Sequence, residues 1–237
     1  MSPPTVEIQQ APHRAQSCEA TLATIRNRID TAGFDALRNK YVWYDSGPAY
    51  RTGYFKYFSL ERYLHKNLKR ARALNLEKSS GKRILDLGSG FGYFLLVCEC
   101  LGHEAVGFDF LDVYDDASGA YHDVCELFGV TRCVERIECR TPLLHPEAEG
   151  PFDLITAFQI CFDNFNEPHR WRIPEWKFFL QDLRSRLSDS GEVFLHFNKP
   201  GDEQVDDPGE IFTYFSSLGA TRVGRDIHFR ERKMLPR

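Results

Sequence analysis

The sequence predicts an α/β fold in which helices cover both faces of a mostly parallel β-sheet, preceded by a helical N-terminal extension. The first observation behind this prediction is that short apolar, strand-like runs alternate with helix-like segments over residues 83–198. Second, a glycine-rich turn joins the first of these strands to the first of these helices. Third, residues 18–40 and 60–74 have helical character. Strands joined through helices run parallel, because a crossover returns the chain to the same end of the sheet.

Composition places the chain among ordinary globular proteins and argues against several classes. A chain of 237 residues with 42% hydrophobic and 27% charged residues fits one α/β domain with an extension. The net charge of −4 argues against a surface that binds nucleic acid. Apolar runs fall short of the roughly 20 residues of a membrane span, and the N-terminus lacks the pattern of a signal peptide. Seven cysteines without zinc-ligand spacing are typical of reduced thiols in a cytoplasmic protein with no metal site.

Three regions are expected along the chain. Residues 1–17 are polar and contain prolines, which predicts disorder. Residues 18–79 form a predicted helical and aromatic cap, and residues 80–237 form the main domain. Within the cap, residues 41–58 contain eight aromatic side chains and several turn signals. Two interpretations of this aromatic segment stay open: a hydrophobic clasp on the core, or a lid over a cofactor or substrate.

The segment 60–74 is predicted to be an amphipathic helix. Apolar residues recur at three- and four-residue intervals from Leu60 to Leu74, which places them on one face, and Ser59 can cap the start. The other faces carry five basic residues: Arg62, Lys66, Lys69, Arg70 and Arg72. These side chains form either a solvated face or a contact with a phosphate-bearing ligand such as nucleic acid.

The glycine-rich turn is predicted to bind a cofactor. Residues 84–87 are a short apolar run typical of a buried strand, and residues 94–101 have helical spacing. Gly88, Gly90 and Gly92 stand between them, and glycine permits sharp turns and the close approach of a ligand. The free N–H groups at the start of a helix favour an anionic or polar group there.

The spacing of the glycines distinguishes between two classes of cofactor. The dinucleotide fingerprint is G-x-G-x-x-G, whereas this chain has G-x-G-x-G, with Tyr93 where the third dinucleotide glycine would stand. The stretch Asp86-Leu87-Gly88-Ser89-Gly90-Phe91-Gly92 resembles motif I of the class I S-adenosylmethionine-dependent methyltransferases. The resemblance implies a Rossmann-like fold with S-adenosylmethionine as the cofactor. In that family an acidic residue and the glycine loop wrap the amino-acid end of the cofactor. The implied cofactor-binding residues of this stretch are Asp86, Gly88, Ser89, Gly90, Phe91, Gly92, Tyr93 and Phe94.

A second acidic residue, Asp109, ends the next predicted strand, which covers residues 105–109. A carboxylate at this position can accept hydrogen bonds from both hydroxyls of a ribose. In the family that the chain resembles, the positions just after this strand often pack against the adenine ring. Those positions are Phe110 and Leu111 in this sequence, so the resemblance implies that they bind the cofactor too.

The clearest later strand covers residues 152–158, after a predicted helix over 121–128 and a weaker strand over 133–138. It resembles the F-D-L-I motif of the same family, whose strand ends beside the sulfonium. The resemblance therefore places Phe158 and Gln159 against the cofactor. The alternative is an ordinary polar turn. The N-P-P-Y and D-P-P-Y motifs of amino-methylating adenine and glutamine enzymes are absent.

The C-terminal part completes the predicted alternation. A helix beginning at Pro174 and ending at Leu187 buries one apolar face, a turn follows over 188–191, and a strand covers 192–198. Residues 210–218 are a predicted helix. The remaining chain has room for one strand near 223–229 and a short partner strand.

Two histidines are candidate general bases: His196 on the fifth predicted strand and His169 in the loop after the fourth. Methyl transfer from a sulfonium needs alignment and exclusion of water, and needs a base only if the acceptor must lose a proton. Each histidine also has a purely structural interpretation. No spacing of metal ligands indicates a cation-dependent enzyme.

The resemblance implies an enzyme that transfers a methyl group from S-adenosylmethionine to an oxygen, nitrogen or carbon atom of an acceptor. The aromatic N-terminal segment and the lack of an added nucleic-acid module favour a small molecule, so we expect neither a nucleic-acid nor a membrane partner. The oligomeric state is left open. The alternatives are an RNA-modifying methyltransferase, an inactive cofactor-binding partner subunit, and an NAD-dependent oxidoreductase.

Overall fold

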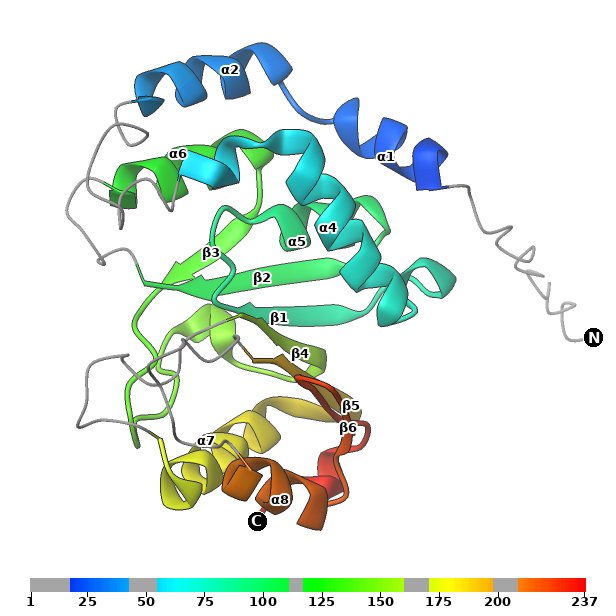
Figure 1. Cartoon of the computed structure of the whole chain (residues 1–237), viewed down its shortest axis with the longest axis vertical. Helices are drawn as coiled ribbons and strands as arrows, with labels where there is room; N and C mark the ends of the chain where they lie inside the picture. Colours follow the sequence, from blue (N-terminus) through cyan, green and yellow to red (C-terminus); the bar gives the residue numbers. More distant parts are fainter. Residues whose placement is uncertain (1–17, 43–54, 111–116, 160–170, 198–208) are drawn as a thin grey trace, which may run out of the picture.

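The computed structural model describes residues 18–42, 55–110, 117–159, 171–197 and 209–237. The described chain forms a seven-stranded sheet with the order β3-β2-β1-β4-β5-β7-β6 (Figure 1). Neighbouring strands from β3 through β5 are parallel, whereas β7 runs antiparallel to β5 and β6 antiparallel to β7. The prediction of a mostly parallel sheet is confirmed.

The five parallel strands follow the predicted apolar runs closely. They are β1 (Arg83–Leu87), β2 (Glu104–Asp109), β3 (Thr131–Val134), β4 (Phe152–Phe158) and β5 (Leu187–His196). The prediction for the third strand was wrong in its bounds. β3 pairs only with β2, and Val134 stands opposite Asp109, the last residue of β2. The Glu135 N–H makes the last hydrogen bond of this pairing, to the Asp109 carbonyl over 3.1 Å, and the chain leaves the sheet where β2 ends.

Helices cover both faces of the sheet, as predicted. The helices above it in Figure 1 are α1 (Cys18–Arg26), α2 (Thr31–Lys40), α4 (Leu60–Ala73), α5 (Tyr93–Cys100) and α6 (Ala117–Phe128). Those below it are α7 (Ile173–Arg186) and α8 (Gly209–Ser217). Ser59 occupies the capping position of α4, but its side chain makes no capping hydrogen bond, so that part of the prediction was wrong. Within the described ranges, none of the helices is long and apolar enough to cross a membrane.

The core consists of two apolar clusters, one on each face of the sheet. Alternate residues of β1 enter different clusters, with Ile84 in the upper one and Leu85 in the lower one. The upper cluster also contains Leu22 of α1 and Phe34 of α2. The N-terminal helices therefore share a core with α4, α5 and α6. The predicted boundary at residue 80 falls inside this shared core and stays a prediction, and residues 1–17 lie outside the described residues.

The connection from α7 to β5 differs from the predicted helix and turn. Leu187 was expected to end the helix, but it begins β5, where it is buried and pairs with Phe152. The next pair on β4 and β5 is Leu154 with Glu192, so β5 carries additional residues between these two pairs. Gly191 permits this close bulge, because a Cβ there would lie 2.8 Å from the Phe152 carbonyl oxygen.

A short antiparallel hairpin closes the sheet. It consists of β6 (Thr221–Val223) and β7 (Asp226–Phe229), so a strand with a short partner is present as predicted. The predicted start at residue 223 was wrong, because Val223 ends β6 and residues 224–225 form the turn. β7 pairs with β5 from Val193 to His196. This pairing brings side chains of the last thirty residues beside the carboxyl end of β5.

Candidate active site

The glycine turn lies between β1 and α5, and the positive φ values of its three glycines explain why glycine is needed there. The φ angles are 72° at Gly88, 56° at Gly90 and 75° at Gly92, a region that side chains disfavour. Gly92 is also crowded, since a Cβ would lie 2.8 Å from Cγ2 of Val130. The Gly88 N–H donates to the Phe108 carbonyl over 2.7 Å, which fixes the turn to β2.

Asp109 lies beside this turn, as the sequence predicted. Its Oδ2 accepts a hydrogen bond from the Gly90 N–H over 2.6 Å, and its Oδ1 accepts one from the Phe110 N–H over 2.8 Å. Burial raises the pKa of Asp109, whereas the Arg132 guanidinium and the two N–H donors act to lower it. The carboxylate is thus held in one orientation, with remaining lone pairs for a ligand.

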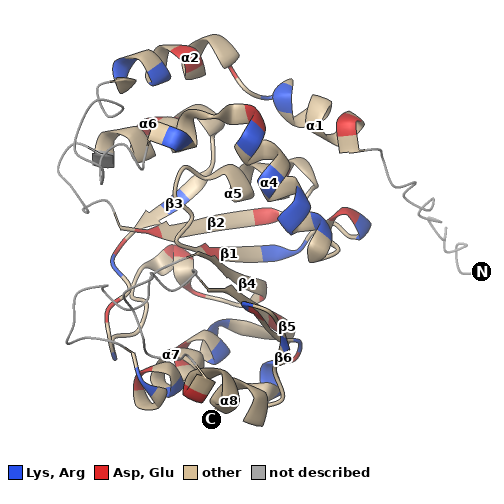
Figure 2. Cartoon of the chain, viewed as in Figure 1, with Lys and Arg blue, Asp and Glu red and all other residues tan. Residues whose placement is uncertain are grey.

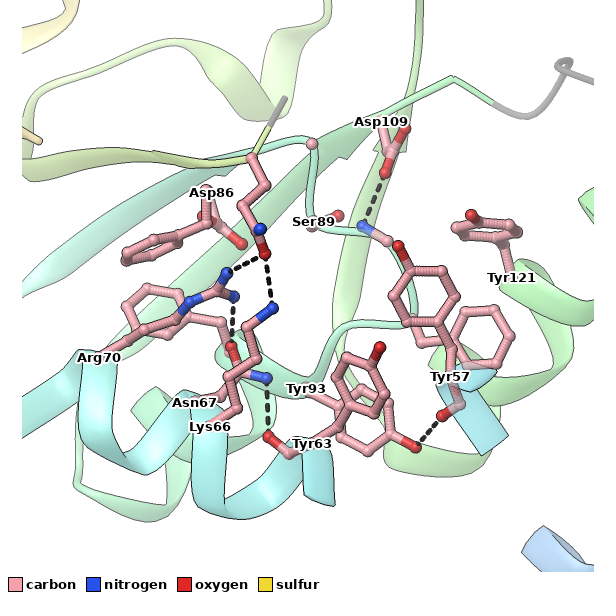
Figure 3. Close-up of a pocket in the computed structure, with 16 residues that line it drawn as sticks. Tyr57, Tyr63, Lys66, Asn67, Arg70, Asp86, Ser89, Tyr93, Asp109 and Tyr121 are labelled. Atoms are coloured by element: carbon pink, nitrogen blue, oxygen red, sulfur yellow. Dashed lines mark hydrogen bonds between the residues drawn. The ribbon is translucent and has the colours of Figure 1, made fainter. Parts of the chain in front are cut away.

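A pocket of about 200 Å³ opens at the carboxyl ends of β1, β2 and β4 (Figure 3). Ten of the predicted cofactor-binding residues line it: Asp86, Gly88, Ser89, Gly90, Phe91, Tyr93, Phe94, Asp109, Phe158 and Gln159. Gly92 instead occupies the N-cap position of α5, and the Arg136 guanidinium lies over the Phe110 ring, 5.4 Å from its centroid. Leu111 and His169 lie outside the described residues.

The pocket also contains side chains outside the predicted cofactor-binding set: Tyr57, Tyr63, Lys66, Asn67, Arg70 and Tyr121. Four of them lie on α4, which crosses the opening of the glycine turn (Figure 3). The interpretation of the basic residues of α4 as a solvated face is wrong for Lys66 and Arg70, because the side of α4 that carries them faces the pocket. Their spacing from Tyr63, at i+3 and i+7, was the available signal.

Lys66 and Arg70 converge on the side-chain oxygen of Gln159. The Lys66 ammonium donates to Oε1 over 2.5 Å and the Arg70 guanidinium over 3.2 Å. Arg70 also donates to Oδ1 of Asn67 and lies over the Phe158 ring, 4.2 Å from its centroid. Burial and the neighbouring positive charges lower the pKa of Lys66 to about 8. Two partly buried cations sharing one neutral oxygen form a site that favours an anion.

Asp86 provides a carboxyl group at the base of the pocket. Its Oδ1 accepts a hydrogen bond from the Thr156 hydroxyl over 2.6 Å. Burial raises the pKa of Asp86 to about 7, although the Thr156 hydrogen bond and the Arg70 charge act in the opposite direction. The hydroxyl of Ser89 is buried nearby and has no hydrogen-bond partner among the described residues. Asp86 and Ser89 both belong to the lining of the pocket.

Aromatic side chains form the remaining wall. Tyr57 and Phe58 pack on Phe91 of the glycine turn, with ring centroids 5.5 and 5.1 Å apart. The Tyr93 hydroxyl donates to the Tyr57 carbonyl over 2.7 Å. The end of the aromatic segment thus both packs on the core, through buried Phe58, and lines the pocket, through Tyr57. Residues 43–54 of that segment lie outside the described residues.

His196 lies near the pocket but is not part of its lining. It ends β5, directly opposite Phe158 of β4 and Asp226 of β7. Its Nδ1 lies 2.5 Å from Oδ1 of Asp226, and its carbonyl accepts a hydrogen bond from the Gln159 N–H over 2.8 Å. Sequence patterns did not indicate the contact with Asp226.

The described cysteines are free thiols: Cys18, Cys98, Cys100, Cys125, Cys133 and Cys139. Among the described residues, His, Cys, Asp and Glu form no group of three or more that could hold a metal ion. Asp109 suits a ligand with two adjacent hydroxyls, and Lys66 and Arg70 suit a carboxylate.

Comparison with known proteins gives a family and a set of fold relatives. A family model described as a methyltransferase domain matches residues 59–207. No curated protein sequence matches the chain. A SAM-dependent methyltransferase from Aquifex aeolicus has 18% identity and a TM-score of 0.46, covering 68% of this chain and 87% of that one.

Two further solved structures are of methyltransferases with different kinds of acceptor. An amino pentose methyltransferase from Micromonospora echinaspora involved in calicheamicin biosynthesis has 17% identity and a TM-score of 0.42, covering 61% of this chain and 54% of that one. A 16S rRNA methyltransferase from T. thermophilus has 20% identity and a TM-score of 0.42, covering 71% and 42%. The chain thus spans about half the length of these two proteins, and at such identities the likeness concerns the fold.

Proposed function

The chain belongs to the methyltransferase domain family, its methyl donor is S-adenosylmethionine, and we propose that it methylates a small-molecule acceptor. One observation carries the placement of the donor in the pocket. Asp109 stands on one side of the glycine turn, and the two cations Lys66 and Arg70 stand on the other (Figure 3). A ribose diol and an amino-acid carboxylate are the two groups of S-adenosylmethionine that need such partners.

We assign the ribose end of the cofactor to Asp109. The N–H groups of Gly90 and Phe110 hold its carboxylate in place, so two hydroxyls can donate to oxygens that are already oriented. Gly90 leaves room for this approach, since even an added Cβ would meet only Tyr121, at 3.8 Å.

We assign the amino-acid end to Lys66, Arg70 and Asp86. The side-chain oxygen of Gln159 occupies the position between the two cations where a ligand carboxylate would be stabilised, so Gln159 must move aside when the carboxylate binds. Asp86 at the base of the pocket suits the ammonium group, whose positive charge favours the ionised form of a carboxyl. These assignments extend the sequence-based proposal by two residues of α4.

S-adenosylmethionine supplies a methyl group on a positively charged sulfur. Because this donor is already activated, the chain has mainly to bind it, orient it and exclude water. The rings of Tyr57, Tyr63 and Phe158 form apolar walls on the side of α4 and β4. Aromatic faces also tolerate a nearby positive charge, which suits the sulfonium.

The distribution of charge supports a small acceptor. In Figure 2 the lysines and arginines of the described chain are interspersed with acidic residues, apart from a group along α4. Of that group, Lys66 and Arg70 face the pocket and are engaged with Gln159. A protein that tracks a nucleic-acid backbone needs a broad basic surface, because its affinity comes from neutralised phosphates.

An RNA acceptor is the second candidate function. The specific observation in its favour is the outer side of α4, where Arg62 and Lys69 are exposed. An inactive cofactor-binding subunit would share the pocket but lack turnover. Membership of the methyltransferase domain family argues against the alternative of an NAD-dependent oxidoreductase.

Two measurements test the proposal. Calorimetric titration with S-adenosylmethionine, S-adenosylhomocysteine and NAD in parallel should give binding of the first two and none of the third. Cell extract incubated with the protein and methyl-tritiated S-adenosylmethionine should then acquire label in its low-molecular-weight fraction. Asp109→Ala serves as the negative control, because losing the ribose acceptor should weaken binding by about 1–3 kcal/mol. Label in the RNA fraction would favour the second candidate, and binding without any transfer would indicate an inactive subunit.

A further inference from the structure

We propose that His196 and Asp226 form a catalytic dyad that removes the proton from a hydroxyl acceptor, which makes the enzyme an O-methyltransferase. This inference rests on the proposed function and specifies the acceptor atom. It assigns His196 as the general base and Asp226 as the residue that positions it.

The dyad lies next to the cofactor pocket on the same face of the sheet. Phe158, which lines the pocket, stands opposite His196 in the parallel pairing of β4 with β5. His196 in turn stands opposite Asp226 in the antiparallel pairing of β5 with β7. Side chains at directly paired positions point to the same face of a sheet. His196 is therefore one strand away from the wall of the pocket, at the carboxyl end of β5, where ligands of such sheets bind.

The two side chains are accessible to a small solute. The side chain of His196 is 26% exposed and that of Asp226 is 42% exposed. Gln159 links the dyad to the pocket, because its N–H donates to the His196 carbonyl while its side-chain oxygen contacts Lys66 and Arg70. An acceptor that enters beside His196 and passes Gln159 would reach the side of the pocket that Phe158 and Gln159 line.

The short contact between Nδ1 of His196 and Asp226 defines which nitrogen acts as the base. An ionised carboxylate only accepts hydrogen bonds, so Nδ1 carries the hydrogen and Nε2 keeps its lone pair. The Nε2 atom can then take a proton from the acceptor. The Asp226 carboxylate stabilises the positive imidazolium that results and keeps its ring oriented.

The step balances as follows. The O–H bond of the acceptor breaks and its proton passes to Nε2 of His196. The acceptor oxygen forms a bond to the methyl carbon, while the carbon–sulfur bond breaks and its electron pair stays on sulfur. The products are a methyl ether, S-adenosylhomocysteine and protonated His196, which returns its proton to solvent through its exposed edge.

A base favours oxygen over nitrogen as the accepting atom. A neutral amine attacks with its own lone pair and can lose its proton after the methyl group has moved. A hydroxyl is a weak nucleophile until a base withdraws its proton in the transition state. A positioned histidine–carboxylate pair beside the pocket therefore matches a hydroxyl acceptor.

The same two strands contain a matched control pair. Nε2 of His228 on β7 lies 2.7 Å from Oε2 of Glu192 on β5. The side chain of His228 is only 14% exposed, and Glu192 lies four positions before His196, away from the carboxyl end of the strand. This pair also joins a histidine to a carboxylate, through Nε2 instead of Nδ1, and neither residue lines the pocket, so its loss reports the structural effect of losing such a contact.

The first test is independent of any acceptor. The ¹⁵N-labelled full chain is examined by NMR at neutral pH, with and without S-adenosylhomocysteine, and His196→Gln identifies the His196 ring signals. For the neutral ring we expect the hydrogen on Nδ1, and a shift towards the other tautomer in Asp226→Asn. A neutral His196 ring that carries its hydrogen on Nε2 overturns the proposal.

The second test measures turnover with phenol as a hydroxyl probe and benzylamine as an amine probe, following S-adenosylhomocysteine release. With phenol, His196→Gln and Asp226→Asn should lower kcat by about 100-fold or more. The Kd for S-adenosylhomocysteine should stay unchanged, and His228→Gln and Glu192→Gln should change kcat by less than about 3-fold.

Equal losses in both pairs, or faster turnover of benzylamine than of phenol, overturn the proposal. If neither probe turns over, the NMR result decides. Failure of S-adenosylhomocysteine to bind the wild-type protein would instead refute the proposed cofactor site.

Discussion

Thr156 on β4 donates a hydrogen bond from its hydroxyl to Oδ1 of Asp86 on β1 over 2.6 Å, and both side chains are buried. The two residues stand opposite each other in the parallel pairing of β1 with β4. Because burial raises the pKa of Asp86 to about 7, this carboxyl changes its charge near neutral pH at the base of the cofactor pocket. The pair therefore makes stability depend on pH.

We predict that the ligand-free protein loses stability as the pH rises towards 8, and that Asp86→Asn removes part of this loss. The pKa of Asp86 is about 7 in the fold and about 3.9 in the unfolded chain. The proton is bound more tightly in the folded state, so this contribution is fully present below about pH 4 and is lost as the pH rises through about 7. The difference amounts to on the order of 2–4 kcal/mol at pH 8. Urea unfolding of both proteins at pH 5 and pH 8 measures it, and an equal difference at both pH values would contradict the assignment.

We predict that Arg70→Met and Lys66→Met weaken binding of S-adenosylhomocysteine by about 10- to 100-fold each, because each removes a charged partner of the carboxylate. Binding of 5′-methylthioadenosine should change much less, since that ligand lacks the amino-acid portion. Lys69→Met is the matched control, because Lys69 is an exposed cation on the same helix. Calorimetry with both ligands measures the effect. Equal weakening of the two ligands would place the carboxylate elsewhere.

The contrast between Asp109 and Arg70 shows where sequence analysis succeeds and where it ends. Asp109 was predictable because a short apolar strand fixes its position at the carboxyl end of the sheet. The glycine turn and Gln159 were predictable for the same reason, since each directly follows a strand. Arg70 was not, because a basic residue on an amphipathic helix is normally solvated. The tilt that brings α4 across the glycine turn is set by tertiary packing of Tyr63 and Leu64.

Asp226 is a second residue that local patterns could not place. Its contact with His196 depends on the antiparallel pairing of β7 with β5, thirty positions apart in the chain. The register of that pairing is fixed by burial of Ile227 and Phe229 in the lower cluster. Similarly, β3 ends at Val134 because β2 ends at Asp109, which the sequence of β3 alone does not reveal.

We predict that Gly92→Ala destabilises the protein more than Gly81→Ala does. Both glycines have similar positive φ angles, 75° and 70°, so both variants incur the backbone cost of about 1–2 kcal/mol. At Gly92 the new methyl group would also lie 2.8 Å from Cγ2 of Val130 and 3.2 Å from Sγ of Cys125, whereas nothing lies within 4 Å at Gly81. Overpacking of this kind adds about 1–3 kcal/mol.

Urea unfolding of the two glycine variants isolates the crowding at the turn, because the backbone term is common to both. S-adenosylhomocysteine binding should also weaken in Gly92→Ala, since the displaced turn carries the Gly90 N–H that orients Asp109. Equal unfolding free energies for the two variants would show that Val130 and Cys125 yield without cost.

We predict that Arg132→Met makes cofactor binding weaker at low pH than at high pH. The guanidinium of Arg132 lies over the Tyr121 ring, 5.3 Å from its centroid, and its charge lowers the pKa of Asp109. Burial acts in the opposite direction, so removing this cation raises the pKa of Asp109 further. A protonated Asp109 accepts fewer hydrogen bonds from the ribose, so affinity should fall as the pH is lowered through that raised pKa. Calorimetric titration of wild type and Arg132→Met with S-adenosylhomocysteine between pH 5 and pH 8 measures the shift. If the affinities of the two proteins fall over the same pH range, Arg132 only supports Tyr121. If the fall occurs at higher pH in the variant, Arg132 belongs to the cofactor site.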